Sequence, residues 1–218
     1  MKHPTLSWLR FSLSSNAFHG FCVNELGSFY LDVIKDRQYT CKKDSAERKS
    51  AQNSMYVILQ MLLSWIAPIC PHTAEEAWSH VPKNSQKSIF FNKWLIIDDS
   101  EIQQTKINLE NWEKILEIKK HVSKELENKR EKNIIGSSLD ANVKILCSDN
   151  LYNLLSEYGD ELKFIFITSK VILERENNLK DGQIYEINGE NLKVEIENSK
   201  NKKCERCWHR CISVGIDK

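Results

Sequence analysis

The sequence predicts a mainly α-helical bundle, followed by a small α+β domain and a short zinc-binding tail that is cut off. Three observations lead to this fold class. Apolar residues recur at helical spacing through much of residues 18–130. Beyond Gly136, short runs rich in Val, Ile and Phe alternate with polar segments, as β-strands do. Residues 199–218 are polar and basic and carry a Cys-x2-Cys pair.

The first predicted helix covers residues 18–35 and follows a Ser-rich segment, 1–17, that we expect to be poorly ordered. Gly27 lies in the middle of this helix at a cost of about 1 kcal/mol relative to Ala, which suggests close packing against another helix there. Residues 36–43 should form a basic connection. The apolar face of the helix consists of Phe18, Cys22, Leu26, Phe29 and Val33.

A second helix should run from Asp44 to about residue 67, because Glu47 stands at capping-box spacing from Asp44. Its later half is apolar nearly all round, which predicts a helix buried in a bundle. Pro68 and Pro71 should end it. Residues 73–76 (TAEE) then suggest a capping box that opens a short third helix.

A fourth helix is predicted for residues 109–130, and short strands are predicted for 143–147, 164–168 and 192–196, with a helix at 151–158. The domains expected from this pattern are 18–133 (helical), 134–198 (small α+β) and 199–218 (zinc-binding module). The apolar stripe of the fourth helix is Leu109, Trp112, Leu116, Val122 and Leu126, and Lys and Glu cover its other face.

The composition limits the function classes. There are 31 Lys and Arg against 30 Asp and Glu, so a nucleic-acid signal has to be local, as between residues 200 and 210. Seven cysteines without a disulfide-framework spacing, no secretory leader and no long apolar span predict a cytoplasmic protein with reduced thiols and no membrane contact. No phosphate-binding loop, dinucleotide fingerprint or nucleophile elbow occurs, so no catalytic residue is assigned.

Two segments can carry chemistry. Lys35, Arg37 and Tyr39 follow a helix and could bind a phosphate and stack a base, although cations there also complement the negative helix C-terminus. Cys204 and Cys207 could hold zinc, form a redox pair or be free surface thiols. Completing a zinc site with His209 and Cys211 would place four ligands within eight residues, which would strain the tetrahedron. The pair Asp98–Asp99 reads as a solvated turn, and His72 as a packing or solvent-facing residue.

With these elements placed, the sequence resembles the C-terminal third of bacterial isoleucyl-tRNA synthetases over residues 18–218. The resemblance rests on residues 21–40 (FCVNELGSFYLDVIKDRQYT), on 65–69 (WIAPI) with 73–78 (TAEEAW), on 159–164 (GDELKF) with 168–169 (TS), and on 203–209 (KCERCWH).

The resemblance implies that the helical part docks against the anticodon stem and loop of isoleucine tRNA and that a zinc module lies near the same RNA. It implies zinc ligation by Cys204 and Cys207. RNA contacts are implied for six residues: Lys35, Arg37, Tyr39, Arg206, Trp208 and Arg210.

The sequence also departs from the family pattern. It has no HIGH or KMSKS motif, no editing domain and no second Cys-x2-Cys pair, which predicts a piece of a longer enzyme, weak zinc binding and no ligase activity of its own. ATP would be needed only by the full-length family enzyme. The leading hypothesis is the tRNA-binding portion of an isoleucine–tRNA ligase. The alternatives are a structural or regulatory protein derived from a synthetase, and a split subunit that acts in trans with a separate catalytic part.

Overall fold

The structure, a computed structural model, describes residues 16–82, 86–93, 108–176, 179 and 181–216. By its internal contacts the chain divides into two compact units. The smaller unit is Arg37–Lys106, and the larger one joins the residues up to Asp36 with those from Ile107 onwards. We call these the helical unit and the sheet unit. The predicted Ser-rich segment 1–17 lies almost wholly outside the described residues.

The helix predicted for residues 18–35 is present, but its middle part, Phe21–Tyr30, is wound as a π-helix, η1. In such a helix the carbonyl five residues back comes close. The hydroxyl of Ser28 accordingly donates to the Val23 carbonyl at 2.8 Å. A Cβ at Gly27 would lie 3.0 Å from the carbonyl oxygen of Cys22 in the same helix. The close approach at Gly27 therefore involves the helix's own backbone, and not a second helix as predicted.

Two short helices, α2 (Leu31–Val33) and α3 (Lys35–Tyr39), continue this segment. In the helical unit, α4 (Ala46–Ile66) is capped by Ser45, whose side chain accepts from the backbone N–H of Arg48. The predicted cap was Asp44, one residue earlier.

The third helix, α5 (Pro71–Ser79), also begins earlier than predicted, because Pro71 occupies its first turn rather than ending the previous helix. The predicted capping-box residues from Thr73 onwards therefore lie inside the helix. A 3-10 turn, η2 (Ile89–Phe91), completes the described part of this unit.

The core of the helical unit forms where α4, α5 and η2 meet, around the buried ring of Trp78. The indole N–H of Trp78 donates to the Gln86 carbonyl at 3.0 Å, which fixes the segment after α5. The prediction that the later half of α4 is buried on all sides is wrong. Val57 and Leu59 are each 38% exposed and Trp65 is 37% exposed. The other buried members of this core are Leu63, Ala67, Ala74, Val81 and Ile89.

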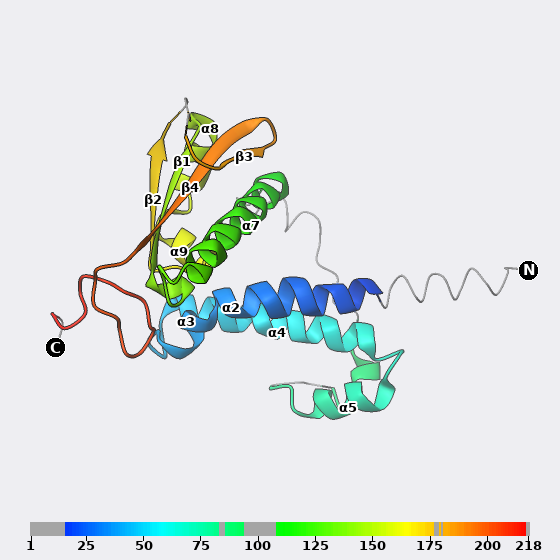
Figure 1. The fold of residues 1–218 in the computed structure, drawn as a ribbon. Coiled ribbons are helices and arrows are strands. Elements are labelled where there is room, and N and C mark those ends of the chain that lie inside the picture. Colours follow the sequence, from blue (N-terminus) through cyan, green and yellow to red (C-terminus); the bar gives the residue numbers. More distant parts are fainter. Residues whose placement is uncertain (1–15, 83–85, 94–107, 177–178, 180, 217–218) are drawn as a thin grey trace, which may run out of the picture. The chain divides into compact units, whose positions relative to one another are not determined.

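The sheet unit contains a four-stranded sheet in the order β2-β1-β4-β3 (Figure 1). β1 (Ala141–Cys147) pairs in parallel with β2 (Lys170–Arg175) and antiparallel with β4 (Glu190–Asn198), and β3 (Ile184–Ile187) is the other edge. Two short helices, α8 (Asp149–Ser156) and α9 (Leu162–Ile165), lie in the crossover from β1 to β2. The prediction of a small α+β region in addition to the helical part is therefore confirmed.

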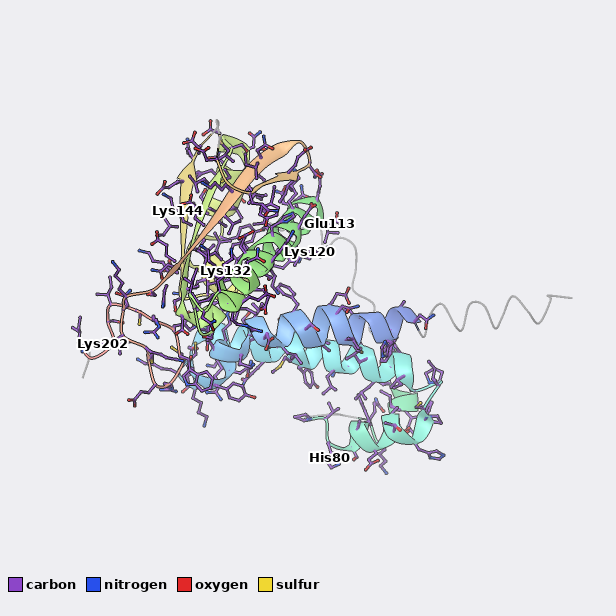
Figure 2. All side chains as sticks on the ribbon, viewed as in Figure 1. His80, Glu113, Lys120, Lys132, Lys144 and Lys202 are labelled. Carbon is purple, nitrogen blue, oxygen red and sulfur yellow. The ribbon has the colours of Figure 1, made fainter. Side chains whose placement is uncertain are left out.

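Helix α7 (Leu109–Glu131) packs its apolar face into the core of this sheet, although the sequence assigned it to the preceding helical domain. The fully buried residues of α7 include Ile115 and Ile118, which the predicted stripe omitted, while Leu109 of that stripe is 66% exposed. The opposite face is charged as predicted, and Glu113 and Lys120 on it are exposed (Figure 2).

The strand predicted for residues 164–168 is absent. This segment instead ends α9 and turns, and Ile167 has a left-handed φ of 55°. Strand β3 was not predicted, because it is only four residues long and lies at an edge of the sheet. None of the described helices combines the length and the apolar character needed to cross a bilayer.

Candidate nucleic-acid interface

The first group of predicted RNA contacts lies on α3 and not in a connecting loop. Lys35 and Tyr39 are exposed and stand four residues apart on this helix, so they share one of its faces. Arg37 is half-buried. The ammonium of Lys35 donates to Asp32 at 2.9 Å, an exposed pair one helical turn away. Tyr39 is 76% exposed.

The second group lies on a short hairpin formed by residues 203–210, which we call the cysteine hairpin. Lys203 and Arg210 form an antiparallel bridge at its base. The N–H of Cys204 donates to the His209 carbonyl at 2.8 Å, and the N–H of Trp208 donates to the Cys204 carbonyl at 2.9 Å. Trp208 adopts a left-handed φ of 64°, which closes the turn and leaves its indole 62% exposed.

The two thiols of the Cys-x2-Cys motif converge inside this turn. Backbone N–H groups of Cys207 and Arg206 point at the sulfur of Cys204 and hold the pKa of that thiol below its ordinary value. Burial raises the pKa of the Cys207 thiol, although the N–H of His209 points at its sulfur and opposes the rise. Backbone donors aimed at both sulfurs suit a pair that binds a cation as thiolates.

This donor set supplies two of the four ligands that structural zinc prefers. Within the described part of the chain, no group of three or more His, Cys, Asp or Glu side chains is arranged to hold a metal ion. His209 in particular directs Nε2 toward Asp36, 2.6 Å away, and not toward the thiols. The described residues of the cysteine hairpin thus bring together two thiol donors.

The outer face of the hairpin combines cations with an aromatic ring. Arg206 and Lys203 are exposed, and the Lys203 ammonium lies 5.3 Å from the centre of the Trp208 ring. Beside it is a surface hollow of about 730 Å³ that Lys202, Lys203, Glu205 and Arg206 help to line. Cations beside an exposed indole are the combination that single-stranded nucleic acid requires, since phosphates pair with the cations and a base stacks on the ring.

Arg210 is placed differently from the other predicted contacts. Its Nε donates to Asp140 Oδ1 at 2.7 Å, and its Nη1 donates to the Asn201 carbonyl at 3.2 Å. Its backbone N–H donates to the hydroxyl of Ser169 at 2.6 Å. Nε, Nη1 and the backbone N–H of Arg210 therefore each have a partner within the chain.

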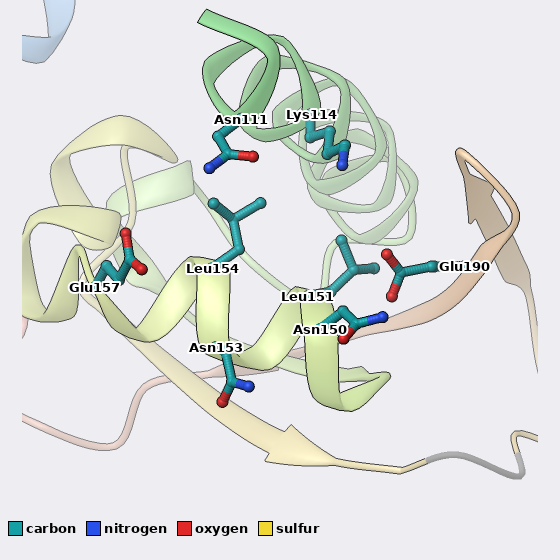
Figure 3. Close-up of a pocket in the computed structure, with 8 residues that line it drawn as sticks. All are labelled: Asn111, Lys114, Asn150, Leu151, Asn153, Leu154, Glu157 and Glu190. Atoms are coloured by element: carbon teal, nitrogen blue, oxygen red, sulfur yellow. The ribbon is translucent and has the colours of Figure 1, made fainter. Parts of the chain in front are cut away.

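A second hollow, of about 290 Å³, lies between α7 and α8 (Figure 3). Its lining is polar, and one of its carboxylates, Glu190, already accepts a hydrogen bond from Ser148. It contains no nucleophile paired with a base. The figure shows Asn111, Lys114, Asn150, Leu151, Asn153, Leu154, Glu157 and Glu190 around it.

Two other predicted features are His72 and the acidic pair Asp98–Asp99. His72 is exposed in the first turn of α5, in agreement with a solvent-facing role. The acidic pair Asp98–Asp99 lies outside the described residues.

Residues 6–145 match the family described as the anticodon-binding domain of tRNA ligase. The isoleucine–tRNA ligase of Francisella philomiragia is 44% identical over 197 residues, which cover 90% of this chain and 21% of that enzyme. The corresponding enzymes of Acinetobacter baylyi and Azotobacter vinelandii are 38% and 40% identical, over 92% and 95% of the chain.

The chain spans about a fifth of the length of these curated relatives, since the matches cover 21–22% of each enzyme. The family match extends from residue 6 into β1 and so includes α3 with its exposed Lys35 and Tyr39. Because that match covers more than half of the 218 residues, the chain belongs to the family of anticodon-binding domains of tRNA ligases.

Proposed function

We propose that this chain is the anticodon-binding portion of an isoleucine–tRNA ligase and binds isoleucine tRNA. The observation that carries the proposal is the family match together with the similarity to isoleucine–tRNA ligases over nine-tenths of the chain. The geometry supports it, because cations and exposed aromatic rings occur together both on α3 and on the cysteine hairpin. The proposed contacts are Lys35, Arg37, Tyr39, Arg206 and Trp208. Arg210, which the resemblance also implied, is bound to Asp140 through Nε and to the Asn201 carbonyl through Nη1.

Fluorescence anisotropy with labelled isoleucine tRNA tests the proposal directly. The affinity should fall steeply as salt rises, because phosphate contacts release counterions. A tRNA with an unrelated anticodon should bind more weakly at the same salt concentration. A salt-independent signal, or a stable dimer of the chain that is indifferent to tRNA, would contradict the proposal and favour the structural alternative.

Matched variants separate phosphate contacts from stacking contacts. Lys35→Ala and Arg206→Ala should each reduce the slope of log affinity against log salt, by roughly 0.7–0.9 for each phosphate that is no longer neutralised. Trp208→Ala and Tyr39→Ala should weaken binding by about 1–3 kcal/mol per stacked base while leaving that slope nearly unchanged. The controls are Lys120→Ala, on the exposed face of α7, and Phe91→Ala, whose ring is 70% exposed on η2.

We also propose that Cys204 and Cys207 form half of a zinc site, completed by thiolates from elsewhere in the assembled enzyme. The observations behind this are the convergence of the two sulfurs and the backbone donors aimed at them. Elemental analysis of the isolated chain after a chelator wash should find less than one zinc per monomer. Tight one-to-one zinc would instead show that His209 or Cys211 completes the site.

A further inference from the structure

Two acidic side chains of the sheet unit, both far from the cysteine hairpin in sequence, contact its residues His209 and Arg210. Asp36, the second residue of α3, contacts His209 at 2.6 Å between Oδ2 and Nε2, although the two residues are 173 positions apart. Asp140, just before β1, holds Arg210 through a 2.7 Å ion pair between residues 70 positions apart. Both acidic residues lie far from the hairpin in sequence, so the two contacts define where it docks.

The contact between Arg210 and Asp140 is part of a hydrogen-bond network that includes Ser137 and Ser169. The second carboxylate oxygen of Asp140 accepts from the N–H of Ser137 at 2.9 Å and from its hydroxyl at 3.1 Å. Ser169 receives the Arg210 N–H and donates its own hydroxyl to the Leu139 carbonyl at 2.5 Å. The Asp140 side chain is 12% exposed and that of Arg210 is 28% exposed, so the charge-assisted bond between them is partly shielded from water and salt.

The contact to Asp36 sits between two proposed RNA contacts. Asp36 immediately follows Lys35 and precedes Arg37, and its partner His209 is only 8% exposed. The His209 ring also meets the Phe164 ring edge-on, with 5.8 Å between centroids. Docking at His209 and Arg210 thus buries the return arm of the hairpin and leaves Arg206 and Trp208 exposed.

We propose that Asp36 and Asp140 are positioning residues for RNA binding. They dock the cysteine hairpin, and so fix the orientation in which Arg206 and Trp208 meet the RNA. Arg210 acts in this arrangement through Asp140 rather than as a phosphate contact. This inference rests on the proposed function, because it names the residues that organise the same interface.

Removing a positioning carboxylate and removing a carboxylate that is merely near the RNA should change RNA affinity in opposite directions. Removing a carboxylate near an RNA-binding surface raises the local positive charge, which by itself tightens binding to phosphates. Removing a positioning carboxylate has the opposite effect on affinity, because the hairpin is then docked, and so competent to bind RNA, for only part of the time. The apparent dissociation constant then rises in inverse proportion to the docked fraction.

The first experiment compares Asp36→Ala with Asp160→Ala in the full 218-residue chain. Both substitutions remove one negative charge, and Asp160 is exposed on the 3-10 turn before α9. We expect Asp36→Ala to raise the dissociation constant for isoleucine tRNA about fivefold, if docking falls to roughly one-fifth. Asp160→Ala should leave it unchanged or lower it. Asp36→Glu should restore most of the affinity, which a general loss of folding would not allow.

The second experiment measures docking without RNA, by hydrogen exchange of the amides in residues 203–211. Asp36→Ala should speed exchange there while the amides of β1 stay protected. A double-mutant cycle of Asp140→Asn and Arg210→Gln covers the other contact. If Arg210 acts through Asp140, the two substitutions should have strongly non-additive effects on tRNA affinity. Additive effects would indicate instead that Arg210 contacts a phosphate directly.

The two possible failures are distinguishable. Failure of the unsubstituted chain to bind tRNA would overturn the proposed function. Unchanged hairpin exchange in Asp36→Ala, or tRNA binding by that variant as tight as that of Asp160→Ala, would overturn the positioning inference while leaving the proposed function intact.

Discussion

At the scale of single residues, two buried side chains of the sheet unit hold their protons well above neutral pH. Cys147 is fully buried on β1, and burial, with lesser effects from Glu190 and Asp149, raises its pKa to about 11. Tyr185 is 7% exposed on β3, and burial followed by its bond to Glu125 raises its pKa to about 12. Neither side chain is part of the proposed interface, so both report on the fold.

The Cys147 thiol should be unreactive in the folded chain. At pH 8 the raised pKa leaves very little thiolate, and burial blocks access to the sulfur. Mass spectrometry after brief treatment with iodoacetamide should find Cys70, which is exposed, alkylated and Cys147 unmodified. Both should react after unfolding in urea. Alkylation of Cys147 at the rate of Cys70 in the native chain would contradict the burial of β1.

Removing the Tyr185 hydroxyl should cost stability in a pH-dependent way. The hydroxyl donates to Glu125 Oε1 at 2.5 Å, and hydrogen bonds to charged groups contribute about 1.5–3 kcal/mol. Because the folded pKa lies above the unfolded value of about 10, this contribution is complete below about pH 10 and is lost as pH rises through 12. Urea unfolding should therefore show Tyr185→Phe destabilised at pH 8, with a smaller difference at pH 11. An equal difference at both pH values would contradict this assignment.

At the scale of elements, two helices of the sheet unit end in the same type of turn. After α7, Asn133 has a φ of 56°, and the N–H of Ile134 donates to the Lys129 carbonyl at 3.0 Å. After α9, Ile167 has a φ of 55°, and the N–H of Thr168 donates to the Lys163 carbonyl at 2.8 Å. Both are Schellman turns, in which the left-handed position favours Gly or Asn. A β-branched residue there carries a backbone cost of about 1–2 kcal/mol.

Replacing Ile167 by Asn should therefore be tolerated. Relief of the left-handed strain offsets the loss of apolar burial from a half-buried side chain, so we expect a stability change of less than about 1 kcal/mol. The same substitution at Ile165, which is helical and 5% exposed, should cost several times more, because it buries an amide without partners. Urea denaturation of the two variants provides the comparison. Equal destabilisation would show that Ile167 is not strained.

The turn at Ile167 also explains why the strand predicted for residues 164–168 was wrong. Residues 164–168 (FIFIT) are apolar and β-branched, which is typical of a strand, and no Gly marks the end of the helix. Tertiary packing overrides that local preference. In contrast, α7, β1, α8 and β4 were predicted close to their true ranges, because their apolar periodicity is regular.

The candidate interface was predictable only in part. The resemblance to isoleucyl-tRNA synthetases implied Arg206 and Trp208, and the structure leaves both side chains exposed. The docking partners Asp36 and Asp140 carry no local signal, since each is an ordinary acidic residue until folding brings it to the hairpin. The ion pair between Arg210 and Asp140 also forms only on folding. Sequence spacing alone therefore could not show that Arg210 has a different role from Arg206.

At the scale of the whole molecule, each compact unit has its own buried core. One surrounds Trp78 in the helical unit, and the other joins α7 to the sheet in the sheet unit. The net charge of +1 gives the chain as a whole no strong overall field, so the proposed RNA binding has to come from local clusters such as the cysteine hairpin. Separate cores also imply that a core substitution should act mainly on the unit that contains it.

That implication can be measured with one substitution in each core. Ile145 is fully buried on the central strand β1, and Leu63 is 6% exposed on α4. Each should lose about 2–5 kcal/mol of stability on truncation to Ala, because the cavity adds to the lost transfer free energy. Hydrogen exchange at increasing urea resolves where that loss appears. Ile145→Ala should weaken the amides of β1 and β4 and spare those of α4 and α5, and Leu63→Ala should do the reverse. If either substitution weakens both sets equally, the two cores unfold as one cooperative unit.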